Sequence, residues 1–186
     1  MVSDPHYQKN EQRLEEIRLK LLRYFSRLRL PAAARKKVLI LEGGGMRGVF
    51  TTGVLQAFHD RHYFPWDIVL GSSAGALTGA AYVAGQIHLS RDAFFGSLLS
   101  SRFIRLMNIV RPSKHVINLD WMIDSVLHGQ EPLDEKKLRR ACPLVVTGTH
   151  IPPGKHPRTV YFNSHRDELT TILKATAALP FLYRGF

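Results

Sequence analysis

The stretch Gly71-Ser72-Ser73-Ala74-Gly75 follows the apolar run 66–70 and precedes the small-residue run 76–82. This order predicts a short buried strand, a sharp turn and a helix. A Gly-x-Ser-x-Gly turn between a strand and a helix exposes the serine hydroxyl at the edge of the sheet, beside the helix N-terminus. Ser73 is therefore the candidate nucleophile. The rest of this elbow is formed by Gly71, Ser72, Ala74 and Gly75.

A second glycine-rich turn lies upstream. The apolar run 38–41 predicts a buried strand, and residues 49–59 predict a helix. The turn between them consists of Glu42, Gly43, Gly44, Gly45, Met46, Arg47 and Gly48. Parallel strands joined by one helix place both turns at the same edge of the sheet. Bare backbone N–H groups are thus expected near Ser73, which acyl transfer needs to stabilise its oxyanion.

The rest of the chain continues to alternate between strand and helix patterns. It predicts an α/β fold with three α/β/α layers and a mainly parallel sheet. The further expected strands are 143–149 and 158–162, and the further expected helices are 90–101 (opened by a Ser90 cap), 120–128, 134–140 and 167–178.

A dinucleotide-binding domain is a competing interpretation of the first turn. Gly43, Gly45 and Gly48 satisfy the pattern Gly-x-Gly-x-x-Gly, and Asp67 lies near the expected position of a ribose-binding acid. Arg47 is unusual inside such a turn, and the next strand ends in the Ser73 elbow instead. These two features favour the acyl-transfer interpretation.

Both turns together resemble a known family. Residues 42–48 and 71–76 are similar to the two N-terminal signatures of patatin-like phospholipases. Residues 174–183 resemble the small-residue helix and Leu-Pro turn of the same family, especially its bacterial branch. The resemblance extends from about residue 38 to residue 186. It implies a serine acyl hydrolase that cleaves fatty-acyl esters of lipids with a Ser–Asp dyad and no cofactor.

The resemblance also implies roles for individual residues. Ser73 would be the nucleophile, and the loop from Gly43 to Arg47 would bind the oxyanion. The family's aspartate lies in an Asp-Gly motif after the region that matches residues 179–183, whereas no aspartate of this chain precedes a glycine. The expectation is therefore the N-terminal part of a catalytic domain whose base is missing. A catalytically incomplete module that binds lipid or a partner protein is the alternative.

Histidines allow a second enzymatic alternative, a Ser-His-Asp esterase. His150, His156 and His165 follow the elbow in the required chain order. The chain offers few strands before its elbow for such a fold, however. The spacing of its histidines matches no zinc pattern and Cys142 has no second thiol, so no structural metal is expected.

The N-terminal region is expected to be separate from the catalytic part, with residues 1–37 forming a basic amphipathic helix and linker and residues 38–186 the patatin-like part. Residues 11–37 contain nine Lys or Arg and three Glu, which gives +6 of the chain's net charge of +11. Such a segment could pack on its own domain or lie on an anionic membrane. No nucleic-acid motif accompanies the charge, so no specific nucleic acid is expected.

Composition sets the remaining bounds. A chain of 186 residues with 45% apolar residues can build the core of one globular domain. It contains no apolar run of about 18 residues, no secretory signal and a single cysteine, so a cytoplasmic protein, peripheral on membrane at most, is expected. An exposed sheet edge would favour self-association.

Overall fold

The computed structural model describes Lys20 and residues 36–96, 118–154 and 156–179. The chain divides into two units, Met1–Arg35 and Lys36–Phe186, and every strand and helix below belongs to the second. Apart from Lys20, the predicted N-terminal amphipathic helix lies outside the described residues. The last residues of the predicted helix 90–101 and residues 180–183 of the family-like stretch also lie outside them.

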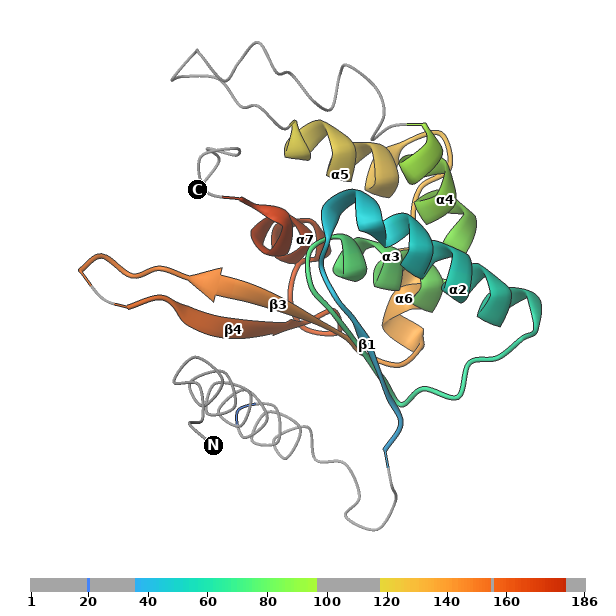
Figure 1. Cartoon of the computed structure of the whole chain (residues 1–186), viewed down its shortest axis with the longest axis horizontal. Coiled ribbons are helices and arrows are strands. Elements are labelled where there is room, and N and C mark those ends of the chain that lie inside the picture. The colour runs from blue at the N-terminus through green and yellow to red at the C-terminus, as the bar shows by residue number, and fades with distance from the viewer. Residues whose placement is uncertain (1–19, 21–35, 97–117, 155, 180–186) are drawn as a thin grey trace, which may run out of the picture. The chain divides into compact units, whose positions relative to one another are not determined.

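Four strands form one sheet in the order β1-β2-β3-β4 (Figure 1). β1 (Val38–Leu41), β2 (Ile68–Gly71) and β3 (Leu144–His150) run parallel, and β4 (Arg158–Asn163) pairs antiparallel with β3. β2 is buried along its whole length, as expected for an interior parallel strand. The predicted α/β fold with a mainly parallel sheet is confirmed.

Six α-helices are described within residues 36–179, and all but one begin and end within two residues of the predicted bounds. They are α2 (Gly48–Asp60), α3 (Ala74–Val83), α4 (Ile87–Phe95), α5 (Leu119–His128), α6 (Glu135–Arg140) and α7 (Leu169–Ala177), together with the short 3-10 helix η1 (Gly45–Arg47). The expected Ser90 cap is wrong, because α4 begins at Ile87 and Ser90 is buried inside the helix.

The described helices gather on one face of the sheet (Figure 1). α3 packs against β2 and β3, α7 packs against β3, and the other helices pack on these two. Right-handed connections from β1 to β2 and from β2 to β3 progress in one direction across the sheet, which places both crossovers on the same face. On the opposite face, Ile40 is 64% exposed. The second helical layer expected from the sequence is not among the described residues.

The core lies between the sheet and this helical layer. α3 forms its centre, since nine of its ten residues are buried. Small side chains let the helix approach the strands closely: a Cβ on Gly79 would lie 3.1 Å from Leu41 Cδ1 and 3.2 Å from Leu144 Cδ1. The largest fully buried side chains of the core come from every layer and include Leu55, Ile87, Ile123, Leu138, Leu144 and Leu173.

Candidate active site

The two glycine-rich turns leave the sheet side by side. Leu41 and Gly71 are the last residues of β1 and β2, and they are register partners in the parallel ladder. The Ser72 N–H donates to the Leu41 carbonyl oxygen at 3.1 Å and so continues the pairing into the turns. The expectation that both turns lie at one edge is thus met.

Glycine is required where the turns meet. A Cβ on Gly43 would lie 3.2 Å from Ser73 Cβ and 3.2 Å from the Ser72 carbonyl oxygen. A Cβ on Gly75 would collide with the carbonyl oxygens of Leu41 and Glu42. These are contacts with backbone and with the candidate nucleophile, so neither turn could accept a side chain without moving the other.

Ser73 has the strained backbone of a nucleophile elbow, with φ 49° and ψ −124°. A non-glycine residue in such a conformation costs about 1–3 kcal/mol, which the surrounding structure must offset. The Ser73 carbonyl accepts hydrogen bonds from Ala76 N–H at 2.9 Å and Leu77 N–H at 3.2 Å. Its N–H donates to the Thr176 hydroxyl of α7 at 2.8 Å.

The glycine turn, predicted from the sequence as an oxyanion loop, has N–H groups near Ser73 that are unpaired in the described part of the chain. Gly45 adopts φ +54°, and the Arg47 N–H closes the turn on the Gly44 carbonyl oxygen at 3.1 Å. No acceptor within the described residues takes the N–H groups of Gly44 and Gly45. The Ser73 N–H, by contrast, is already engaged by the Thr176 hydroxyl at 2.8 Å.

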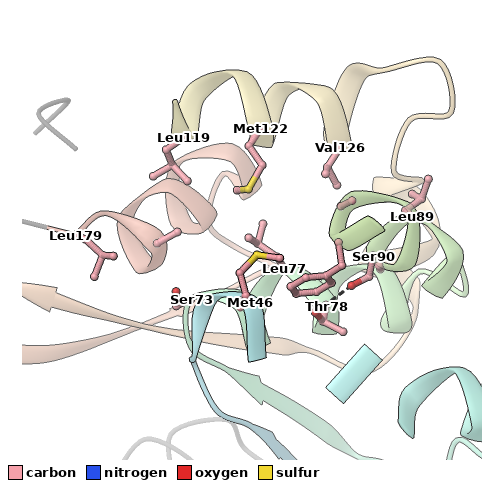
Figure 2. A pocket seen from close by; sticks show the side chains of 16 residues that line it. Met46, Ser73, Leu77, Thr78, Leu89, Ser90, Leu119, Met122, Val126 and Leu179 are labelled. Atoms are coloured by element: carbon pink, nitrogen blue, oxygen red, sulfur yellow. Dashed lines mark hydrogen bonds between the residues drawn. The ribbon is translucent and has the colours of Figure 1, made fainter. Parts of the chain in front are cut away.

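An apolar pocket of about 240 Å³ opens beside Ser73. Its walls are almost entirely hydrocarbon and come from η1, α3, α4, α5 and α7. In Figure 2, Ser73 and Ser90 lie on opposite sides of the pocket, with Met46 and Leu77 between them and Met122 of α5 above. Met46 and Leu179, which also line the pocket, are 43% and 50% exposed.

Three buried hydroxyls form a chain at the end of the pocket far from Ser73. Ser90 Oγ donates to Thr78 Oγ1 at 3.0 Å and lies 2.9 Å from Thr52 Oγ1. This chain joins α2, α3 and α4 and satisfies polar atoms that would otherwise be buried without partners. Sequence patterns gave no signal for it, because Ser90 resembled a helix cap.

No general base is present beside Ser73 in the described part of the chain, where neither a carboxylate nor an imidazole hydrogen-bonds to its hydroxyl. Of the three histidines proposed for a triad, His150 accepts a hydrogen bond from Arg158 Nε at 3.1 Å on the β3–β4 hairpin. His156 and His165 are exposed. The described residues therefore do not assemble a Ser-His-Asp triad.

Asp67 does not suit the ribose-binding role of a dinucleotide site. It precedes β2 and so lies at the opposite edge of the sheet from the glycine turn. Its carboxylate accepts from the Lys37 N–H at 2.8 Å and lies 3.6 Å from Lys36 Nζ. These contacts, the Lys37 hydrogen bond foremost, lower the pKa of Asp67 below its ordinary value and fix the entry to β1.

The last helix, α7, is anchored at both ends. Glu168 caps it by accepting from the N–H groups of Thr170 and Thr171 at 2.9 and 2.6 Å. Desolvation raises the pKa of Glu168, but hydrogen bonds from Thr171 and Thr170 outweigh it and lower the pKa to about 2. Nearer its C-terminus, Lys174 Nζ forms a 2.6 Å ion pair with Asp120 of α5.

The family model for patatin-like phospholipases matches residues 39–186, which include both turns, the pocket and α7. The chain belongs to the patatin-like phospholipase family. Membership places it at the family level among lipid hydrolases and confirms the resemblance inferred from the sequence.

Two relatives illustrate the extent of the similarity. The uncharacterized protein YjjU of Escherichia coli (strain K12) is 30% identical over 153 residues, which are 79% of this chain and 41% of that protein. The type III effector protein ExoU is 20% identical, with a TM-score of 0.46 over 78% of this chain and 40% of that one. The chain thus spans about two fifths of the length of either protein.

The described part of the chain has neither a metal-binding cluster nor a membrane-spanning helix. It contains no group of three or more His, Cys, Asp or Glu residues able to hold a metal ion. None of its helices is long and apolar enough to cross a bilayer. Cys142 is partly buried, and burial raises the pKa of its thiol to about 11.

Proposed function

We propose that the patatin-like part of this chain hydrolyses acyl ester bonds of lipids through an acyl-Ser73 intermediate. One observation carries the proposal: Ser73 stands between the glycine turn and an apolar pocket. A lipid ester needs both surroundings, because its carbonyl oxygen becomes an anion while its acyl chain must leave water.

The reaction would follow the usual order for a serine acyl hydrolase. Ser73 Oγ attacks the ester carbonyl carbon, and the resulting oxyanion accepts hydrogen bonds from the loop of Gly43, Gly44, Gly45, Met46 and Arg47. Collapse of this intermediate releases the alcohol and leaves the acyl group on Ser73. Water then attacks the acyl-enzyme and releases the fatty acid, which restores the serine hydroxyl.

Proton transfer requires a base that the described residues do not supply. We propose that a carboxylate in the Asp-Gly motif implied by the family resemblance takes the Ser73 proton and returns it to the leaving alcohol. A serine hydroxyl without such a base is a weak nucleophile at neutral pH. In the described residues no carboxylate or imidazole hydrogen-bonds to the Ser73 hydroxyl. This observation also favours the alternative function, a catalytically incomplete module that binds lipid in the pocket.

A fluorophosphonate probe distinguishes the two functions. The 186-residue chain is incubated with the probe and its intact mass is measured, with Ser73→Ala as the blank and Ser125→Ala of α5 as the matched control. A stoichiometric adduct on the wild type and on Ser125→Ala, absent from Ser73→Ala, supports an activated nucleophile. Folded protein that forms no adduct would show that these 186 residues alone do not activate Ser73, and would exclude hydrolysis by them without the proposed Asp-Gly carboxylate.

The positive charge of the N-terminal region suggests that the protein associates with membranes. We propose that residues 11–37 attract the protein to anionic membranes through Coulomb attraction, with no specific nucleic acid as partner. Sedimentation with liposomes that contain an anionic lipid, at low and high salt, tests this association. A DNA mobility shift in the same buffers is the comparison, and equal binding to both would indicate generic charge attraction only.

A further inference from the structure

The main chain at Ser73 is held from three directions, by the neighbouring strand β1, by α3 and by α7. The preceding residue, Ser72, donates its N–H to Leu41 of β1, and the Ser73 carbonyl is bound by the first turn of α3. The first contact comes from the pairing of β1 with β2, and the second comes from the start of α3. Neither contact uses the Ser73 N–H.

Thr176 supplies the third contact, from a distant part of the chain. Its hydroxyl oxygen lies 2.8 Å from the Ser73 nitrogen, across a sequence separation of 103 residues. The bond is made to the main chain of Ser73. It therefore fixes the backbone angle of the elbow without competing for the Oγ that attacks the substrate.

The position of Thr176 is itself well fixed. Leu169, Ile172 and Leu173 bury α7 against the core, and the helix packs on β3, α3 and α5. The Glu168 cap and the ion pair between Lys174 and Asp120 hold the two ends of the helix. A hydroxyl carried on so constrained a helix can set the position of the residue that it binds.

We propose that Thr176 is a positioning residue that holds Ser73 in its attacking conformation through the Ser73 main-chain N–H. This role rests on the proposed function of Ser73 as nucleophile. Thr176 does not touch the reacting atoms. Its loss would let the elbow relax from positive φ and move Oγ away from the oxyanion loop, so the rate of serine acylation would fall while the acyl pocket stayed intact.

Two substitutions separate the hydroxyl from the shape of the side chain. Thr176→Val keeps the β-branched volume and removes the acceptor, whereas Thr176→Ser keeps the acceptor and removes a methyl group. Thr171→Val, at an exposed site on the same helix, controls for the effect of valine on α7.

Amide hydrogen exchange of Ser73, followed by NMR, measures the contact without any need for activity. We expect Thr176→Val to raise the exchange rate of the Ser73 amide at least tenfold, and Thr176→Ser and Thr171→Val to leave it near the wild-type rate. The rate of fluorophosphonate labelling should fall at least tenfold in Thr176→Val and recover in Thr176→Ser. Equal chemical shifts elsewhere would show that Thr176→Val is folded.

The two readouts keep the proposals apart. If the wild type takes up no probe, the nucleophilic function of this chain fails, and the Ser73 exchange rate alone decides whether Thr176 holds the elbow. An unchanged exchange rate in folded Thr176→Val would overturn the contact. If the Ser73 amide of Thr176→Val exchanges faster but Ser73 is labelled at the wild-type rate, the hydrogen bond to Thr176 does not matter for acylation of Ser73.

Discussion

Gly43 approaches Ser73 so closely that a Cβ on the glycine would lie 3.2 Å from the serine Cβ. This contact joins the ends of β1 and β2 into one site, since each turn provides the surface against which the other packs. A side chain at position 43 would therefore push the two turns apart.

Gly43→Ala should slow fluorophosphonate labelling of Ser73 at least tenfold, because the added methyl group pushes the oxyanion loop away from the elbow. The labelling rate is measured by intact mass against time. The matched control is Gly53→Ala in α2, where a Cβ meets nothing within 4 Å and where alanine should stabilise the helix by about 0.5–1 kcal/mol. Equal labelling of Gly43→Ala and wild type would contradict the close packing.

Ala93→Phe should shorten the acyl chains that the protein accepts. Ala93 lines the pocket on α4, and a phenyl ring there would fill space that an acyl chain needs. Binding of a series of fatty acids of increasing length, measured by calorimetry, should lose its longest members first. Ala57→Phe, on α2 and outside the pocket lining, should keep the wild-type length profile; a parallel loss in both variants would point to general misfolding.

Ser90→Ala should lower the free energy of unfolding by about 1–3 kcal/mol, since the buried hydroxyl of Thr52 loses its partner. Urea denaturation measures the change. Ser125→Ala, whose partly exposed hydroxyl bonds to the Trp121 carbonyl oxygen at 2.7 Å in its own helix, should cost less. If Ser90→Ala is as stable as the wild type, the hydroxyl chain does not stabilise the packing of α2, α3 and α4.

Glu168 should make the free energy of unfolding depend on pH in the acidic range. Its pKa is about 2 in the folded protein against 4.5 for an unperturbed glutamate, so its stabilising effect is full above about pH 4.5 and disappears as the pH falls through 2. Glu168→Gln should therefore destabilise the protein at pH 7 and converge with the wild type near pH 2. The difference should stay below about 1 kcal/mol, because the carboxylate is largely solvent-exposed.

Urea denaturation at pH 7, 5, 3 and 2 measures that convergence. Glu135→Gln, in the first turn of α6, is the control for removing a surface carboxylate. A stability gap between Glu168→Gln and wild type that is the same at every pH would show that the charge of Glu168 does not cap α7.

Cys142 should react slowly with iodoacetamide in the folded protein. Burial raises the pKa of its thiol to about 11, so very little thiolate is present at pH 8. Since the chain has one cysteine, the mass increase reports this site alone. Urea should speed the reaction strongly; equal rates in folded and unfolded protein would contradict the burial.

The strands and the two turns could be predicted from sequence because local patterns determine them. Apolar runs predict β1 and β2. Glycines predict where the two turns pack against each other, as the contacts of Gly43 and Gly75 show. Thr176 and Ser90 could not be assigned in this way. Each bonds to a partner brought near only by tertiary packing, and neither residue type nor spacing identifies the partner.

The hydrogen bond between Ser73 and Thr176 also has a consequence for biosynthesis. A ribosome releases the whole strand-turn-helix around Ser73 about a hundred residues before Thr176, since the two are separated by 103 positions. The nascent chain can therefore form its glycine turn and serine turn early and still lack the contact that fixes the serine. Such a delay would leave the proposed nucleophile without its last backbone contact until α7 has been synthesised.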